Sequence, residues 1–319
     1  MEGFSLLATL FKVNEIAELK RRSGIEVRTF AGPASFAGTM DPIRIVHVTD
    51  LHVGRVTPMR VQLDAVAIAN AANPDLVVIT GDFVCHSQLY LDALKQVIEA
   101  FTAPVVCVLG NHDYWSGADE VRHTLRAAGA LVLSNVNTVI TIRNQPLQLV
   151  GLDDAYTGHA HRDEAVRGMR RDIPTLGLSH IAEEADALWR EGVPLVLSGH
   201  THAGQVTVAR LHELAVGRFA GHKYVHGLYG TRNVETRQTG AVYVGAGIGA
   251  AVMPIRLGER GRRELTIFEL GAQPGSFAEH HTEQPALLGR MPTPELVLKR
   301  REAVAKKKEK RERRAVGRV

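Results

Sequence analysis

The chain of 319 residues is 45% hydrophobic and 23% charged, a composition that excludes a collagen-like or wholly disordered protein. Residues 299–319 contain eleven Lys or Arg and three Glu, a net charge of +8, so the total of +4 leaves −4 for residues 1–298. Because the positive charge lies in the tail, the body gives no general indication of nucleic-acid binding. Two cysteines, Cys85 and Cys107, are too few for a disulfide framework and fit a reducing, cytoplasmic compartment.

The N-terminal stretch is amphipathic. It places apolar side chains near helical spacing at Phe4, Leu7, Leu10 and Phe11. Charged residues interrupt it well before the ~20 apolar residues that a membrane span needs, and it lacks the basic start and cleavage site of a secretory signal. We expect a helix that either packs on the body or lies on a membrane surface, and packing is the simpler alternative.

Short runs rich in Val, Ile and Leu come next. They occupy residues 43–49, 75–80, 104–109, 146–152, 173–179 and 194–198. The runs are continuous rather than alternating, which is typical of strands buried on both faces. Helix-like segments at 60–72, 88–101 and 117–129 lie between several of them. This order predicts an α/β architecture with largely parallel central strands.

Two more strands are expected at 240–250 and 263–270, antiparallel and with a glycine-rich connection after the first. Beyond residue 272 apolar residues no longer recur regularly, and the sequence is rich in Pro, Gly and polar residues, as in a linker. We therefore divide the chain into an N-terminal amphipathic helix and lead-in (1–42), a main domain (43–270), and a linker with a basic tail (271–319).

Side chains able to bind a metal follow five of the predicted strands. They are Asp50 and His52, Asp82, Asn111 with His112 and Asp113, His180, and His200 with His202. The loops beyond the carboxyl ends of parallel strands converge on one crevice, so we expect these residues to meet. In an extended segment Asp50 and His52 point the same way. His200 and His202 do so as well if their segment is extended, and face two neighbouring ions if it turns.

The number of these side chains exceeds what one four-coordinate ion uses. Two ions that share a bridging carboxylate fit better. Imidazole, carboxylate and amide groups without a thiolate suit Mn, Fe or Zn. Each motif alone also has a structural explanation, since Gly, Asn and Asp are ordinary turn residues.

The ordered motifs "DLH", "GD", "GNHD", "SH" and "GHTH" resemble the signature of the calcineurin-like metallophosphoesterases over roughly residues 43–270. The segments "TDLHVG", "GHTHAGQV", "YVHGLYG" and "PIRLG" resemble the bacterial branch with YkuE-type and YaeI-type phosphodiesterases and a UDP-2,3-diacylglucosamine pyrophosphatase. The resemblance implies a metal-dependent phosphoesterase with a four-layer αββα sandwich, in which helices flank two mixed sheets.

The resemblance also implies roles for individual residues. One ion would be held by Asp50, His52, Asp82 and His202, and the second by the bridging Asp82 with Asn111, His180 and His200. His112, oriented by Asp113, would be a non-ligand acid that protonates the departing oxygen while a hydroxide between the ions attacks phosphorus.

The chain departs from this branch in three places. Members commonly begin with a membrane-spanning or signal segment, Pro and Asp often follow the lone His where this chain has residues 181–184, and "VGAGIGA" lacks an Arg that this strand often carries. These departures concern the substrate rather than the metals. Substrate contacts are expected from His222, Tyr224 and His226 in "GHKYVHGLYG", whereas His47, inside a strand, is expected to be structural.

The favoured function is a phosphodiesterase or pyrophosphatase that acts on a lipid-linked or nucleotide-linked substrate, such as UDP-2,3-diacylglucosamine. A nuclease is the alternative, and the basic tail is its specific support. A non-catalytic scaffold is less favoured because it would have lost ligands, and this chain retains them. The tail is either a solvated charge run or a contact with anionic lipid at the inner face of the membrane.

Overall fold

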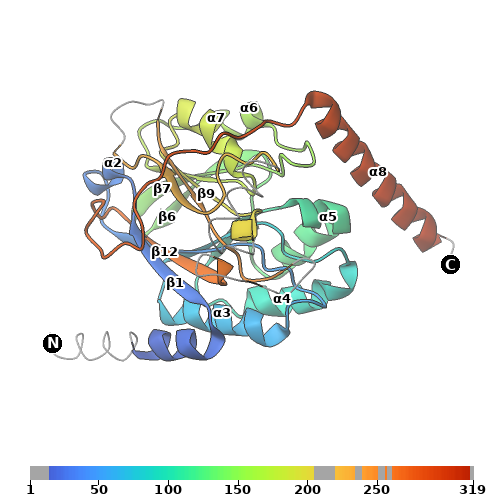
Figure 1. Ribbon diagram of the computed structural model, residues 1–319, viewed down its shortest axis with the longest axis horizontal. Coiled ribbons are helices and arrows are strands. Elements are labelled where there is room, and N and C mark those ends of the chain that lie inside the picture. The colour runs from blue at the N-terminus through green and yellow to red at the C-terminus, as the bar shows by residue number, and fades with distance from the viewer. Residues whose placement is uncertain (1–13, 205–219, 234–238, 251–255, 257–260, 317–319) are drawn as a thin grey trace.

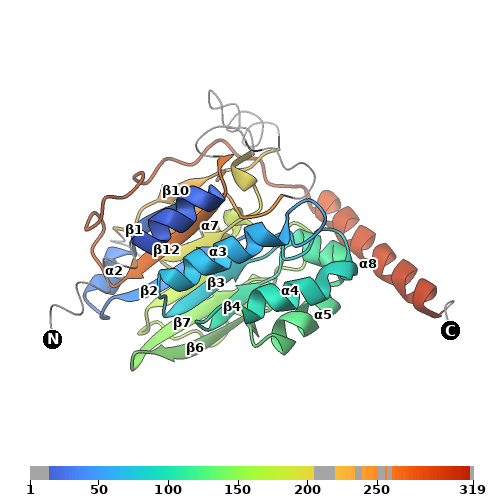
Figure 2. The same ribbon diagram turned by 90° about the horizontal axis from the view of Figure 1, so that it is seen from below.

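The computed structural model describes residues 14–204, 220–233, 239–250, 256 and 261–316. Two mixed six-stranded β-sheets pack face to face, and helices cover their outer faces (Figure 1; Figure 2). The predicted four-layer α/β class is therefore confirmed. The apolar residues of the N-terminal stretch, Phe4 to Phe11, lie outside the described residues.

The first sheet has the strand order β1-β12-β2-β3-β4-β5. Its strands are β1 (Glu26–Ala31), β2 (Ile43–Val48), β3 (Leu76–Thr80), β4 (Val105–Val108), β5 (Leu131–Val132) and β12 (Glu264–Leu270). Strands β2 to β5 are parallel, so the carboxyl ends of β2, β3 and β4 lie at one edge. β12 runs antiparallel to β2 and parallel to β1, so the sheet also takes in a strand from the lead-in at 1–42.

The second sheet has the order β10-β11-β9-β8-β7-β6. Its strands are β6 (Val136–Ile142), β7 (Gln145–Gly151), β8 (Thr175–Leu178), β9 (Leu195–Ser198), β10 (Gly227–Gly230) and β11 (Ala241–Val244). β7, β8, β9 and β11 are parallel. The expectation that the strands at 240–250 and 263–270 pair antiparallel is wrong, because β11 and β12 belong to different sheets. Their glycine-rich connection crosses between the sheets, where the amide of Gly249 donates to the carbonyl of Asp50 at 2.7 Å.

Helices complete the outer layers. Against the first sheet lie α3 (Met59–Ala71), η1 (Gln88–Tyr90), α4 (Leu91–Glu99) and α5 (Asn111–Ala127); against the second lie α6 (Arg162–Ala165), η2 (Ala182–Glu184) and α7 (Ala185–Arg190). The short α2 (Ala34–Ala37) and η3 (His202–Gly204) lie in loops. α5 begins six residues before the expected helix at 117, so Asn111, His112 and Asp113 form its first turn rather than a preceding loop.

Neighbouring residues of one strand fill different apolar layers. Ile45 of β2 faces the second sheet, in the same cluster as Leu197 of β9. The next residue, Val46, packs toward the helices with Ile68 of α3. This burial of both faces explains why the predicted strands read as continuous apolar runs.

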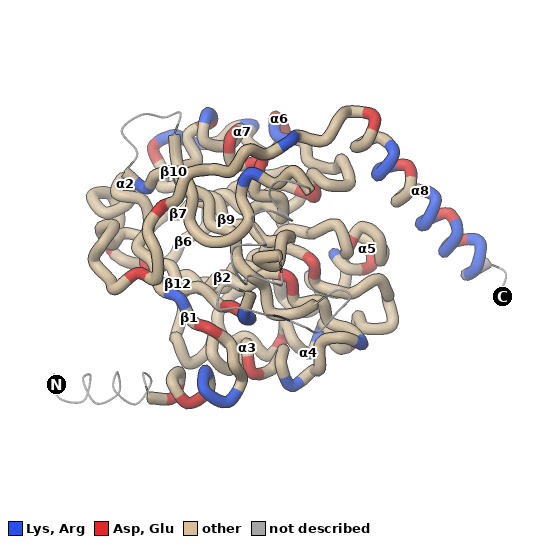
Figure 3. The backbone as a smooth tube through the Cα atoms, in the orientation of Figure 1, with Lys and Arg blue, Asp and Glu red and all other residues tan. Residues whose placement is uncertain are grey.

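Helices also lie at both ends of the described chain. Residues 14–23 are helical, and Ile16 and Leu19 pack on the apolar cluster beneath α3 to α5. The basic tail forms α8 (Pro294–Val316), along which Lys and Arg recur (Figure 3). Val304 of α8 is buried in the same cluster. No helix within the described ranges is both long and apolar enough to cross a bilayer.

A buried ionic cluster ties the two sheets together. Glu264 of β12 is 2% exposed and pairs with Arg28 of β1. It also accepts from the Tyr243 hydroxyl of β11 at 2.6 Å and lies 2.8 Å from Nε2 of His226. Burial alone would raise the pKa of Glu264, but His226, Arg28 and Tyr243 together hold that pKa well below its usual range.

Removing this carboxylate should destabilise the fold. We expect Glu264→Gln to lower the free energy of unfolding by ~3–5 kcal/mol, since it leaves Arg28 buried without its counter-charge and removes the carboxylate beside His226. Urea unfolding followed by circular dichroism measures the change. The matched control is Glu191→Gln, which breaks an exposed pair with Arg171 and should change nothing measurable. Equal stability of the two variants would contradict the role of the cluster.

Candidate metal centre

All seven predicted ligands meet where the carboxyl ends of the two sheets approach each other. Loops after β2 and β3 of the first sheet carry Asp50, His52 and Asp82, and the first turn of α5, which follows β4, carries Asn111. Segments after β8 and β9 of the second sheet carry His180, His200 and His202. Convergence of the strand ends thus assembles the site from residues up to 152 positions apart, Asp50 and His202.

Asp50, His52 and His202 form the first group. Nε2 of His52 lies 3.0 Å from Nε2 of His202, which is 3.3 Å from Oδ1 of Asp50. The potential ligand atoms of these three residues all lie within 4.8 Å of one another. This is the spacing that one shared ion requires.

Asp82, His180 and His200 form the second group, also within 4.8 Å. The side-chain oxygen of Asn111 belongs with them, 3.2 Å from Nε2 of His180 and 2.9 Å from Nδ1 of His200. His200 and His202 therefore serve different groups, as expected for a turning segment.

Asp82 connects the two groups. Its Oδ2 lies 3.5 Å from Nε2 of His52 in the first group and 3.3 Å from Nε2 of His180 in the second. Its other oxygen accepts the main-chain amide of His112 at 2.8 Å. One carboxylate oxygen thus reaches both groups, which is the arrangement expected of a bridging ligand.

The backbone of these residues is strained. Five of the seven have positive φ: Asp50 (52°), His52 (45°), Asp82 (56°), His200 (76°) and His202 (51°). Such angles cost about 1–3 kcal/mol each and cluster at functional sites. The expectation that Asp50 and His52 share a direction through an extended segment is therefore wrong, since the left-handed turns, and not strand alternation, aim both side chains.

Asp113 holds the turn that carries Asp82. Its carboxylate accepts the main-chain amides of Asp82 at 3.0 Å, Phe83 at 2.8 Å, Val84 at 3.2 Å and Gly110 at 2.9 Å. The expectation that Asp113 orients the His112 ring is wrong, because these amides occupy the carboxylate. Asp113 is a positioning residue for Asp82. Gly110 is needed as well, since a side chain there would collide with the Asp82 carboxylate.

Comparison with known proteins identifies the family of the chain. The family model described as calcineurin-like phosphoesterase matches residues 43–204. The chain belongs to this family. It is a metal-dependent phosphoester hydrolase.

Two bacterial relatives resemble most of the chain. Phosphodiesterase YaeI of Escherichia coli is 32% identical over 219 residues, 66% of this chain and 80% of that protein. The uncharacterized metallophosphoesterase YkuE of Bacillus subtilis is 25% identical over 236 residues, 72% of this chain and 79% of that protein. Among solved structures, a 5'-nucleotidase precursor from Thermus thermophilus matches with a TM-score of 0.46 and 16% identity, over 84% of this chain and 58% of that one.

The residues of the centre fit the divalent ions of this phosphoesterase family. Oδ1 of Asp50 is buried and accepts no hydrogen bond from any residue that the structure describes. It lies 3.3 Å from Nε2 of His202, which faces Nε2 of His52 at 3.0 Å. A cation between these atoms would give Oδ1 the partner that it lacks. The oxygen and imidazole donors are those that divalent transition metals accept.

Burial sets the charge of the imidazoles. It lowers the pKa of His52 to about 3 and holds the pKa values of His200 and His202 well below the usual range, so these rings are neutral, the form that binds metal. For His180, burial acts in the same direction, but nearby carboxylates, Asp82 foremost, raise the pKa to about 10. Metal binding at His180 would therefore displace a proton. Burial also raises the pKa of Asp50 to about 6, a cost that a bound cation offsets.

His112 lies beside both groups. Its Nε2 is 4.0 Å from Oδ2 of Asp82, and its ring packs 4.7 Å from His52 and 4.8 Å from Trp115. It is also within 4.8 Å of His52 and Cys85 in a third group of potential ligands.

Cys85 and Cys107 are not joined by a disulfide.

The predicted substrate residues separate into two classes. The His222 ring lies 5.2 Å from His200, at the edge of the centre. Substrate contact by Tyr224 and His226 was a wrong expectation. Tyr224 is 2% exposed and donates to Asp186, and His226 is 1% exposed and pairs with Glu264.

The sequence analysis did not predict two residues that lie near the ligands. The Tyr156 ring lies 5.3 Å from His200, in a polar loop whose composition gives no signal for it. Nη2 of Arg256 lies 3.3 Å from Nδ1 of His202. The "PIRLG" segment was the only signal for Arg256. As expected, His47 is structural, with Nε2 2.8 Å from the Thr80 hydroxyl.

The bridging position of Asp82 predicts how metal content responds to substitution. Asp82→Asn should lose both ions, because the bridge to each is weakened. Asp50→Asn should lose only the ion of the first group. Elemental analysis of protein equilibrated with Mn²⁺ measures the stoichiometry, and His161→Ala, which replaces an exposed side chain, is the control. Retention of two ions by Asp82→Asn would contradict the bridge.

Proposed function

We propose that the protein is a phosphodiesterase or pyrophosphatase that acts on a lipid-linked or nucleotide-linked phosphate ester. The observation that carries this proposal is the single Asp82 oxygen within 3.5 Å of a ring nitrogen in each ligand group. Two adjacent ions suit a phosphoryl group, whose attacking and leaving oxygens both need stabilisation. The relative that bears the name phosphodiesterase supports the same reaction.

When bound, two divalent ions lower the pKa of water and offset negative charge on the phosphoryl oxygens. The ligand chemistry suits Mn, Fe or Zn, and we propose Mn for the first trials. Asp50, Asp82 and the imidazoles hold these charges in a buried site, where electrostatic interactions are stronger than in water.

His112 is proposed as the general acid. As a water oxygen bonds to phosphorus and the ester P–O bond breaks, the imidazolium form of His112 gives its proton to the departing oxygen. The ring then takes up the proton released by the attacking water, which restores its starting form. The Asp82 carboxylate accepts the His112 main-chain amide, so the bridging ligand also positions the acid. Trp115 and His86 pack around the His112 ring and restrict its rotation.

This role predicts a separation of metal binding from turnover. His112→Asn should keep both ions and lose ~10²- to 10⁴-fold in kcat for a poor leaving group. The loss should be smaller for bis-p-nitrophenyl phosphate, whose departing phenolate needs little protonation. Metal analysis beside kinetics on both substrates checks this. Equal losses on both substrates, or loss of metal, would refute the assignment.

The same assay, with Mn²⁺, separates the candidate substrates. Wild-type protein should prefer bis-p-nitrophenyl phosphate to p-nitrophenyl phosphate and should hydrolyse a UDP-linked lipid. Efficient cleavage of single-stranded DNA, lost on truncation at Lys299, would favour the nuclease alternative instead. No hydrolysis of any of these esters would overturn the proposed function.

We also propose that α8 contacts anionic lipid. Its exposed Lys306 and Lys310 lie on a helix rich in basic residues, each worth about 1 kcal/mol near a charged leaflet. The protein should sediment with vesicles that contain anionic lipid at low salt and dissociate at high salt. Lys306→Glu with Lys310→Glu should weaken binding, and neutral vesicles are the control. No sedimentation at low salt would exclude the contact.

A further inference from the structure

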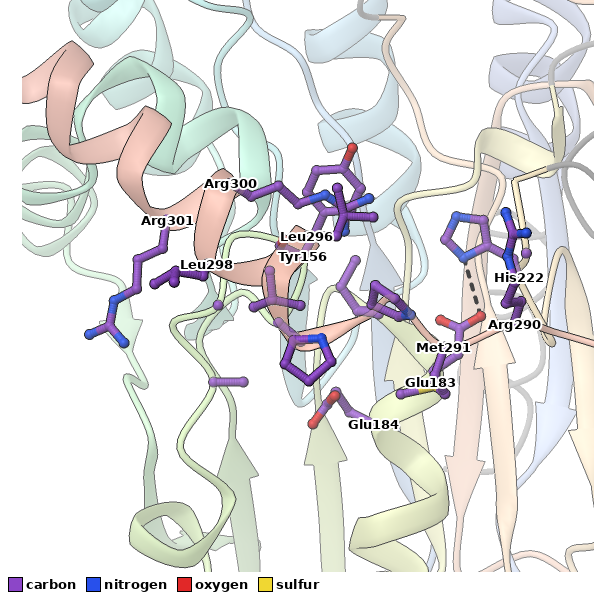
Figure 4. A pocket seen from close by; sticks show the side chains of 18 of the residues that line it. Tyr156, Glu183, Glu184, His222, Arg290, Met291, Leu296, Leu298, Arg300 and Arg301 are labelled. Carbon is purple, nitrogen blue, oxygen red and sulfur yellow. Dashed lines mark hydrogen bonds and ion pairs between the residues drawn. The ribbon is translucent and has the colours of Figure 1, made fainter.

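A pocket of about 530 Å³ opens between the loop at 155–162 and the segment at 290–301, which includes the first turns of α8 (Figure 4). This volume is within the range of small-molecule sites. The segment at 290–301 lies beyond residues 43–204, which match the family model. One wall of the pocket is therefore built from sequence outside the matched region.

The pocket adjoins the metal centre. Tyr156 and His222 both line it, and their rings lie 5.3 Å and 5.2 Å from the ring of His200. A phosphate held at the second ligand group would therefore have its substituent next to these two side chains. The pocket is placed to receive the part of a substrate beyond the scissile phosphate.

The C-terminal wall is held in place by contacts with the body. The amide of Arg290 donates to the carbonyl of Gly221 at 2.7 Å, and that of Leu287 donates to the carbonyl of Lys223 at 2.9 Å. Val297 packs so closely on Gly158 that a Cβ there would lie 2.7 Å from the valine Cγ1. These contacts lie on both sides of the pocket, so the wall is an integral part of the fold.

The lining combines apolar side chains with cationic groups. Met291, Leu296 and Leu298 contribute exposed hydrophobic surface, with 57%, 41% and 58% exposure. Such apolar surface at the mouth of a site favours an apolar ligand. Met291 lies on the His222 side of the pocket, whereas Leu298 lies beside Arg301 (Figure 4).

Arg300 supplies a cationic group beside Tyr156. Its guanidinium lies 3.6 Å from the centroid of the Tyr156 ring and forms no ion pair with any residue that the structure describes. By contrast, Glu184 of the lining is paired with Arg162, and Glu183 with His222. The acidic groups of the lining thus have partners other than Arg300, which is left to bind an anion.

We propose that this pocket binds an amphiphilic group of the substrate, with an alkyl or acyl chain against Leu296 and Met291 and a second phosphate at Arg300. The inference rests on the proposed phosphoesterase function and names the substrate class of that site. A nucleobase is less suited, because the large aromatic ring of the lining, Tyr156, is already covered on one face by Arg300.

Three ligands separate the two parts of this proposal. Farnesyl diphosphate and isopentenyl diphosphate share a head group and differ in chain length, whereas farnesyl phosphate lacks the second phosphate. Their dissociation constants are measured by calorimetry on the Mn-loaded protein. Farnesyl diphosphate should bind at least about tenfold more tightly than isopentenyl diphosphate, the gain from burying roughly two methylenes. Farnesyl diphosphate should also bind about tenfold more tightly than farnesyl phosphate, because its second phosphate accepts a charged hydrogen bond from Arg300.

Each ratio should depend on a different side chain. Leu296→Asp should abolish the difference in dissociation constant between farnesyl and isopentenyl diphosphate. Arg300→Gln should abolish the difference between farnesyl diphosphate and farnesyl phosphate. Leu288→Asp is the matched control, since Leu288 is 98% exposed just before the segment at 290–301 and does not line the pocket. It should leave both ratios intact.

Wild-type ratios near one, or ratios that both pocket variants leave unchanged, would overturn the inference while hydrolysis of bis-p-nitrophenyl phosphate continued. Absence of that hydrolysis by the metal-loaded protein would instead overturn the proposed function, and this inference with it.

Discussion

The site depends on one carboxylate that is not a ligand. Asp113 accepts four main-chain amides across the turns after β3 and β4 and so offsets the cost of the left-handed conformation at Asp82. Asp82 in turn reaches both ligand groups and the amide of His112. Metal spacing and the position of the proposed acid are therefore set by the same short segment, which Gly110 allows to approach closely.

Much of this arrangement could be predicted because parallel strands converge at their carboxyl ends. Strand alternation, however, does not apply in the loops. Asp50 and His52 have φ values of 52° and 45°. A glycine in the sequence would indicate such positive angles, but Asp and His do not. The sequence therefore indicated which residues meet, whereas the directions of their side chains came from hydrogen bonds between distant loops.

Other residues were misplaced because their partners are remote in sequence. His226 pairs with Glu264 in a strand of the other sheet, and Tyr224 donates to Asp186 of α7. A local motif cannot show whether such a side chain faces the site or the core. The pairing of β11 and β12 failed for the same reason, since a glycine-rich connection is compatible with a hairpin or with a crossing between sheets.

The C-terminal helix shows how composition can conceal packing. Its charge run predicts solvation, yet Val297, Arg300, Val304 and Arg311 follow helical spacing and are its less exposed positions. Exposed ion pairs such as Lys308 with Asp119 add little, whereas burial of Val304 contributes on the order of 1.5–3 kcal/mol. Apolar packing thus holds α8 against the body, and the basic side chains remain available at the mouth of the pocket. Attachment by packing leaves the charge of the helix free for an anionic ligand.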